Sequence, residues 1–193
     1  MEEKKNNKMR VLFLLIGFAS LFVIKFLDAL VNHVTLSFTG LLYLISFAVM
    51  IVSFSMKKNK EGIFAVGLFI MAVVTFMDMF DALSMSTVYI AGLEGVYAVL
   101  SVVNFLITAT TGYIAYMFFT SSTKDHKKLI KLIVTIVRAV LYFFLYMMII
   151  TLETSYLGKE IVTCVLNLIF SLAMQGLLTV VLLLSDLNKV VKE

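Results

Sequence analysis

Residues 96–120 read VYAVLSVVNFLITATTGYIAYMFFT, a stretch that contains no charged side chain. A helix that crosses the hydrocarbon core of a bilayer needs about 20 consecutive apolar residues. Five more apolar segments accompany this one, so the six predicted spans are 11–31, 36–56, 63–83, 96–120, 129–152 and 161–184. The pattern predicts an all-α integral membrane protein with six transmembrane helices in one membrane domain over residues 11–185.

The composition supports the same fold class. Of the 193 residues, 62% are apolar and only 15% are charged, whereas a soluble domain carries about 25% charged residues. So few charges cannot cover a water-exposed surface, which argues against a soluble enzyme and against nucleic acid as a partner. The chain has no proline, so we expect mostly straight helices, and this disfavours a carrier built on broken helices.

The basic residues predict the orientation. Most of the 16 Lys and Arg residues lie in the tail 1–10, in the connections before residues 63 and 129, and in the tail 186–193. With six spans these four segments share one side, and positive loops face the cytoplasm. We therefore expect a multi-pass protein of a plasma membrane, of bacterial type, with both termini in the cytoplasm.

A short internal similarity leaves two interpretations open. Residues 28–30 and 81–83 both read Asp-Ala-Leu, and each is followed by Gly-Leu, after nine and eight residues respectively. Both copies stand at the outer end of an odd-numbered span. One interpretation is a bundle of three helical hairpins in parallel orientation; the other is coincidence in a chain of few residue types.

Ionisable residues inside spans are the best functional pointers, because each costs about 2.5–3.5 kcal/mol at a helix centre and needs a partner or a cavity. Lys25 and Asp28 lie near the outer end of the first span, and Asp78 and Asp81 near that of the third. One hypothesis is an outer-leaflet polar pocket in which Lys25 meets Asp78, with Asp28 and Asp81 at the mouth. The alternative is that Lys25 extends to the interface and the acids only end their helices in water.

Arg138 lies about two turns inside the fifth span, and no acidic residue lies at a matching depth in another span. We therefore expect its side chain to extend back to the lipid phosphates.

Polar uncharged residues form two stripes. Asn167, Ser171 and Gln175 share one face of the sixth span, and Asn104 shares a face with threonines of the fourth. The pair Thr108-x3-Gly112 is of the small-xxx-small type that lets helices approach closely. The stripes predict either ordinary interhelical contacts or a polar cavity between the two helices.

The sequence offers no catalytic or metal site. The two histidines, His33 and His126, are expected on opposite sides of the membrane, and Cys164 is the only cysteine. We expect no enzyme, no metal and no cofactor, and no motif assigns a family.

The predicted function is binding of a small molecule or ion in the outer-leaflet pocket, as a transport-associated subunit. The expected ligand-binding residues are Lys25, Asp28, Asp78, Asp81, Asn104, Asn167 and Gln175. The alternative is a non-catalytic scaffold, sensor or immunity subunit. In either case the expected partners are the lipid bilayer and another membrane protein or a second copy of this chain.

Overall fold

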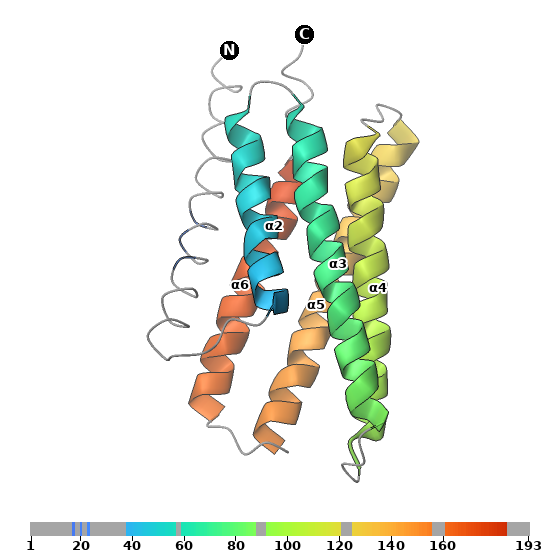
Figure 1. Ribbon diagram of the computed structural model, residues 1–193, viewed down its shortest axis with the longest axis vertical. Helices are drawn as coiled ribbons and strands as arrows, with labels where there is room; N and C mark the ends of the chain where they lie inside the picture. Colours follow the sequence, from blue (N-terminus) through green and yellow to red (C-terminus); the bar gives the residue numbers. More distant parts are fainter. Residues whose placement is uncertain are drawn as a thin grey trace.

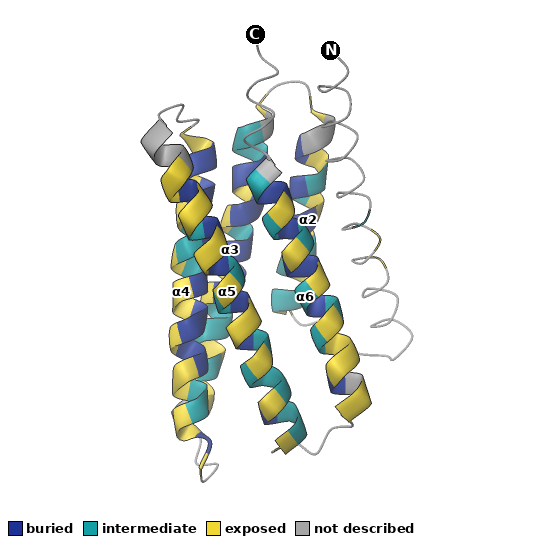
Figure 2. Cartoon of the chain, turned by 180° about the vertical axis from the view of Figure 1, so that it is seen from behind, coloured by how far each residue is buried: buried dark blue, intermediate teal, exposed yellow. Residues whose placement is uncertain are grey.

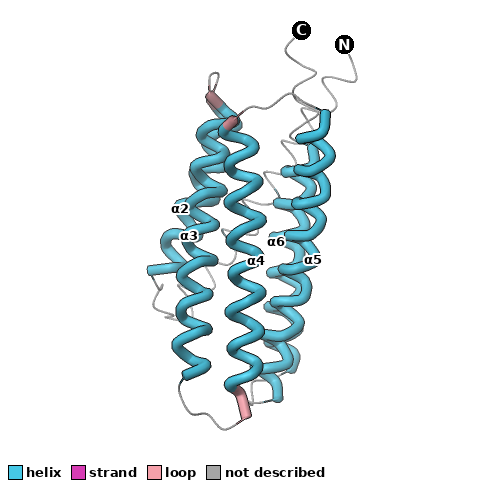
Figure 3. Tube along the Cα trace, turned by 90° about the vertical axis from the view of Figure 1, so that its right-hand side faces the viewer, coloured by secondary structure: helices cyan, strands magenta, loops and turns pink. Residues whose placement is uncertain are grey.

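The computed structural model describes residues 38–56, 59–87, 92–120, 125–155 and 161–184, together with residues 17, 20 and 23. This described part is helical and contains no strand. Its long elements are α2 (Phe38–Ser55), α3 (Lys60–Thr87), α4 (Glu94–Phe119), α5 (Asp125–Ser155) and α6 (Ile161–Leu184), and Figure 3 shows α3, α4, α5 and α6 running alongside one another. The predicted all-α class is confirmed.

Four of these helices are long and apolar enough to cross a membrane, over Glu61–Met85, Glu94–Phe119, Leu129–Ser155 and Cys164–Leu183. The apolar part of α2 is shorter, Phe38–Ser53. Of the first predicted span only Gly17, Ser20 and Val23 are described, all three as helix. The described chain is therefore a helical bundle of membrane type, with four candidate spans where the sequence predicts six.

Helices that follow one another in the chain pack side by side: α2 on α3, α3 on α4, α4 on α5 and α5 on α6. Two ends of the bundle are distinguished below. At the Lys60 end α3 begins and α4 finishes; at the Glu94 end α3 finishes and α4 begins. The shorter α2 covers only the part of α3 near the Lys60 end (Figure 1).

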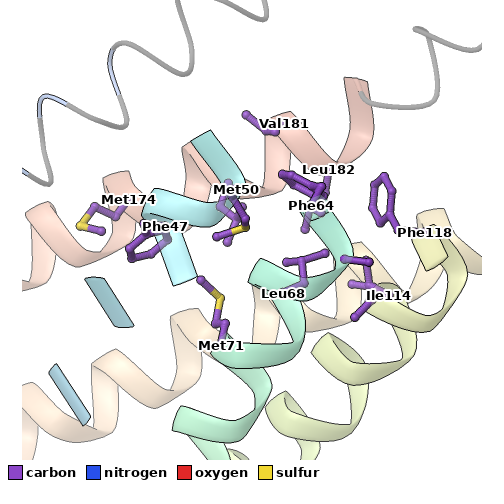
Figure 4. Close-up of a cluster of buried hydrophobic side chains, with 13 residues drawn as sticks. Phe47, Met50, Phe64, Leu68, Met71, Ile114, Phe118, Met174, Val181 and Leu182 are labelled. Atoms are coloured by element: carbon purple, nitrogen blue, oxygen red, sulfur yellow. The ribbon is translucent and has the colours of Figure 1, made fainter. Parts of the chain in front are cut away.

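The buried side chains form two apolar clusters. The Lys60-end cluster joins α2, α3, α4 and α6 and includes Phe47, Met50, Phe64, Leu68, Met71, Ile114, Phe118, Met174 and Leu182 (Figure 4). The Glu94-end cluster joins α4 and α5 through Leu100, Val103, Ile107, Tyr142, Leu145 and Leu152. The outward faces are exposed (Figure 2) and carry large apolar side chains such as Phe69, 61% exposed, and Val140, also 61% exposed. An apolar outer surface of this kind is suited to lipid.

Helices α2 and α3 approach each other closely at Gly67. A Cβ atom added to Gly67 would lie 2.8 Å from the backbone oxygen of Ser46 and 3.1 Å from the backbone nitrogen of Met50, so only glycine allows this contact. By contrast, a Cβ atom at Gly112 would meet nothing within 4 Å. No other described helix therefore approaches Gly112 closely, and the prediction of a close helix contact at Thr108-x3-Gly112 is wrong for this glycine.

Candidate functional site: a buried arginine beneath a polar pocket

Arg138 lies in the middle of the bundle, with none of its side chain exposed. The predicted extension to the lipid phosphates is wrong. That prediction considered only acidic partners, whereas the arginine is held by neutral acceptors from three other helices. A buried charge needs partners, and hydroxyl, amide and sulfur groups supply them here.

The guanidinium group makes three hydrogen bonds. Its Nε donates to Oγ1 of Thr111 at 3.0 Å, and its Nη2 donates to Oε1 of Gln175 at 3.1 Å. The same Nη2 reaches Sδ of Met71 at 3.3 Å. Hydrogen bonds from a charged donor are roughly twice as strong as neutral ones, so Arg138 ties α5 firmly to α3, α4 and α6.

Two further contacts extend this arrangement. The amide nitrogen of Gln175 donates to the hydroxyl of Tyr43 on α2 at 2.8 Å. The guanidinium carbon of Arg138 lies 4.6 Å from the ring centre of Tyr142, within range for a cation–π interaction. We call Arg138 and these five partners the Arg138 network; it contains side chains from all five long described helices.

A pocket of about 450 Å³ adjoins the network on the side of the Glu94 end. We call it the Asp78 pocket. Its walls come from the same five helices and consist of Tyr43, Thr75, Asp78, Asp81, Ala82, Met85, Tyr97, Leu100, Asn104, Tyr142, Leu145, Tyr146, Ile149 and Ser171. This volume lies within the range of about 300–1,000 Å³ that is typical of small-molecule sites.

The residues that line the pocket range from buried at one end to exposed at the other. Thr75 is 2% exposed, Asn104 7% and Tyr142 2%, whereas Asp81 and Met85 are exposed. Ten residues separate Thr75 from Met85 on α3, which corresponds to about 15 Å at 1.5 Å per residue. The pocket therefore extends from the middle of the bundle and opens toward the Glu94 end.

Hydrogen bonds fix the wall between α3 and α4. The hydroxyls of Thr75 and Thr108 lie 2.9 Å apart, and the hydroxyl of Ser101 donates to the backbone oxygen of Met79 at 3.2 Å. These contacts hold the helix that carries Asp78 against the helix that carries Asn104.

The structure brings some of the predicted site residues together and separates others. Asp78, Asp81 and Asn104 all line the pocket. Gln175 is buried below it in the Arg138 network. Asn167 is exposed and is not among the lining residues, although Ser171, one turn away, is.

Lys25 and Asp28, the two predicted site residues on the first span, lie outside the described residues.

Sequence reasoning missed the aromatic walls. Tyr43, Tyr97, Tyr142 and Tyr146 all line the pocket, and the rings of Tyr142 and Tyr146 stack with their centres 5.9 Å apart. A signal was present in the sequence, because residues 138, 142 and 146 recur at four-residue spacing and so share one face of a helix.

Among the described residues, two buried polar atoms at this site have no hydrogen-bond partner: Nη1 of Arg138 and the hydroxyl oxygen of Tyr142. Tyr142 is itself a lining residue of the pocket. A buried polar group without a partner costs about 1–3 kcal/mol, and a bound molecule that supplies the missing bond would recover part of that energy.

The described residues contain no group of three or more His, Cys, Asp or Glu side chains that could hold a metal ion. Comparison with family models, with curated proteins and with solved structures finds no match to this chain. The functional argument therefore rests on the geometry of the site.

Proposed function

We propose that this protein is a multi-pass membrane protein that binds a small molecule in the Asp78 pocket, as a transport-associated subunit without catalytic activity of its own. The observation that carries the proposal is the pocket itself. Asp78 and Asp81 line one cavity of about 450 Å³, and so does Tyr142, whose buried hydroxyl has no hydrogen-bond partner. An isolated structural bundle gains nothing from such groups, because charges and unpaired hydroxyls inside a membrane protein are costly.

Access from one side supports a capture role. Between the Arg138 network and the Lys60 end, the bundle interior holds large buried side chains, among them Leu68, Ile114, Phe118 and Leu182 (Figure 4). A ligand in the pocket therefore enters and leaves toward the Glu94 end. A subunit that captures its ligand on one side and hands it to a partner chain needs only this opening.

The proposed topology has six spans, with the Glu94 end outside and both termini in the cytoplasm of a bacterial cell. The connections α2–α3 and α4–α5 both lie at the Lys60 end. Lys57, Lys58, Lys60, Lys124, Lys127 and Lys128 belong to these connections or to the helix starts beside them. Positive loops face the cytoplasm. Reporter fusions after residues 58, 91 and 123 test the topology: the fusion after residue 91 alone should report an external location.

Lys25 and Asp28 complete the proposed mouth of the pocket. In this proposal Lys25 pairs with Asp78 when no ligand is bound, and Asp28 lies at the rim beside Asp81. A Lys25→Met variant and a Lys25→Met/Asp78→Asn double variant test the pair by thermal unfolding. The double variant should be more stable than Lys25→Met alone, and strictly additive effects would contradict the pairing.

Ligand screening by thermal unfolding of the purified protein is the direct test of function. A ligand that binds the folded state raises the unfolding temperature. Shifts should appear for the native protein and for Glu94→Gln, a control that makes the same type of acid-to-amide change at an exposed position outside the pocket. They should be reduced or lost in Asp78→Asn. Identical shifts in all three proteins would show that the pocket is not the site.

An interaction subunit is the second candidate, and the weak burial of α5 favours it. In its span 22% of residues are buried, against 44% in the spans of α3 and α4. Ile133, Val140 and Phe144 are each more than half exposed on it. Native mass spectrometry separates the candidates: a stable partner chain without any bound small molecule would favour this second function.

A further inference from the structure

Both charged residues that line the Asp78 pocket are acidic. Asp78 and Asp81 are both among its fourteen lining residues, and none of those fourteen is basic. A carboxylate accepts hydrogen bonds but donates none, and in an environment of low dielectric it requires a counter-charge. The described walls thus provide a place for a positive group and no place for a negative one.

Aromatic faces add to the same preference. Four of the lining residues are tyrosines, at positions 43, 97, 142 and 146. The face of an aromatic ring attracts a cation, with about 0.5–2 kcal/mol per contact, and aromatic walls around a cationic group are a common way to hold ammonium compounds.

Tyr142 provides an independent observation that points to a ligand. Its side chain is 2% exposed, it lines the pocket, and its hydroxyl has no hydrogen-bond partner. The oxygen of a tyrosine hydroxyl can accept a hydrogen bond. An ammonium group, which carries only donors, would satisfy that oxygen and a carboxylate of the pocket together.

The nearby arginine does not reverse this preference. Nε and Nη2 of Arg138 already bond Thr111 and Gln175. Its Nη1 has no hydrogen-bond partner, but this atom is buried. The ring of Tyr142 lies over the guanidinium group, and Arg138 is not a lining residue. An anion in the pocket would therefore meet Asp78 and Asp81 rather than Arg138.

We infer that the Asp78 pocket binds a small organic ammonium ion with an apolar body, its charged group between Asp78 and the Tyr142 hydroxyl and its body against the tyrosine rings. This inference rests on the proposed function, because it names the ligand class of the same pocket. Such a group occurs in free amines and in the headgroups of some lipids, and both share this chemistry.

Three probes with the same body and different charge test the inference: 4-phenylbutylamine, which is a cation at neutral pH, 4-phenylbutanol, which is neutral, and 4-phenylbutyrate, which is an anion. Their dissociation constants are measured by calorimetry on the full-length protein in detergent. The amine should bind at least about tenfold more tightly than the alcohol, and the butyrate should bind most weakly.

Variants locate the charged group of the probe. Asp78→Asn should bring the affinity for the amine close to that for the alcohol, while Glu94→Gln should leave the tenfold preference unchanged. Tyr142→Phe removes the unpartnered hydroxyl and keeps the ring. It should weaken binding of the amine by about two- to tenfold without lowering the unfolding temperature, a combination that a purely structural role of Tyr142 would not give.

The outcomes separate the inference from the proposed function. Equal binding of the three probes, or an amine preference that survives Asp78→Asn, refutes the inference and leaves a small-molecule pocket standing. No binding of any probe refutes both. Repeating the titration in nanodiscs of phosphatidylglycerol, with and without phosphatidylethanolamine, identifies the source: competition by phosphatidylethanolamine assigns the group to a lipid headgroup, and its absence assigns it to a free amine.

Discussion

The Arg138 network predicts an unusual pattern of mutational effects, in which removal of a neutral partner is worse than removal of the charge. Gln175→Leu takes away the acceptor at 3.1 Å from Nη2 of Arg138. The acceptor that remains for that nitrogen is Sδ of Met71, a weak acceptor, and Nη1 already has no partner. A buried charge that loses its partner costs about 3–5 kcal/mol, so Gln175→Leu should destabilise the protein by about 3 kcal/mol or more.

Arg138→Met should cost much less. It gives up the hydrogen bonds to Thr111, Gln175 and Met71, but it also removes the buried charge itself. Replacement of a buried charged group by an apolar side chain of similar volume is often close to neutral, and we expect a change within about 2 kcal/mol of the native protein.

The double variant Arg138→Met/Gln175→Leu is the decisive measurement. Without the arginine, a leucine at position 175 no longer strands a buried charge. The double variant should therefore be more stable than Gln175→Leu alone, with a coupling energy of about 2 kcal/mol or more. Asn167→Leu is the matched control, because it makes the same type of amide-to-leucine change at an exposed position on α6 and should alter stability by less than about 0.5 kcal/mol.

Cys164 provides the assay. It is the only cysteine in the chain and so forms no intrachain disulfide, and it is 2% exposed, so a thiol-reactive fluorescent dye reports unfolding at one known position. Unfolding is followed in detergent with each variant under identical conditions. If Gln175→Leu costs the same with and without Arg138, or if Arg138→Met is the most damaging change, the description of the network as a partnered buried charge is refuted.

Three further pairs of variants test local packing by the same assay. Gly67→Ala should destabilise the protein by about 1–3 kcal/mol, because its Cβ would press on the α2 backbone. A Cβ atom at Gly112 meets nothing within 4 Å, so Gly112→Ala should stabilise the helix by about 0.5–1 kcal/mol. Similar effects at both glycines would contradict the packing. Gly92→Ala should cost about 1–2 kcal/mol from backbone strain at φ +95°, while Gly95→Ala, in open space inside α4, should cost nothing. Thr75→Val and Thr108→Val should each cost about 1 kcal/mol and should not add in the double variant, because both remove the same 2.9 Å contact; additive costs would show that the contact contributes nothing.

The helical membrane character could be predicted from the sequence because it depends on composition and length alone. The placement of Asp78, Asp81 and Asn104 could also be anticipated, since helical rise gives depth directly and all three now line one pocket. Lateral arrangement is a different matter. Asn167 and Gln175 share a helix face by periodicity, yet one is exposed and the other is buried, because α6 packs into the bundle over only part of its length.

Arg138 could not be placed from the sequence for a further reason. Its partners are neutral and stand on α3, α4 and α6, at positions 71, 111 and 175. An acidic partner for an arginine can be found in a sequence as a second charged residue. A threonine, a glutamine and a methionine do not stand out in the same way among the other residues of transmembrane helices. Only the packing of the helices shows that these atoms converge.

The Arg138 network and the Asp78 pocket share Tyr142. Its ring lies against the guanidinium group of Arg138, and it lines the pocket together with Asp78. Two carboxylates and one guanidinium leave a formal charge of −1 in this region, which a single ammonium group would neutralise and a dication would exceed. A second positive group in the ligand would also meet Arg138 behind Tyr142. If the pocket binds an ammonium ligand as proposed, the buried arginine would set an upper limit on the ligand's charge, although it is not a lining residue, and this would be a physical reason for the chain to bear the cost of a charge at that depth.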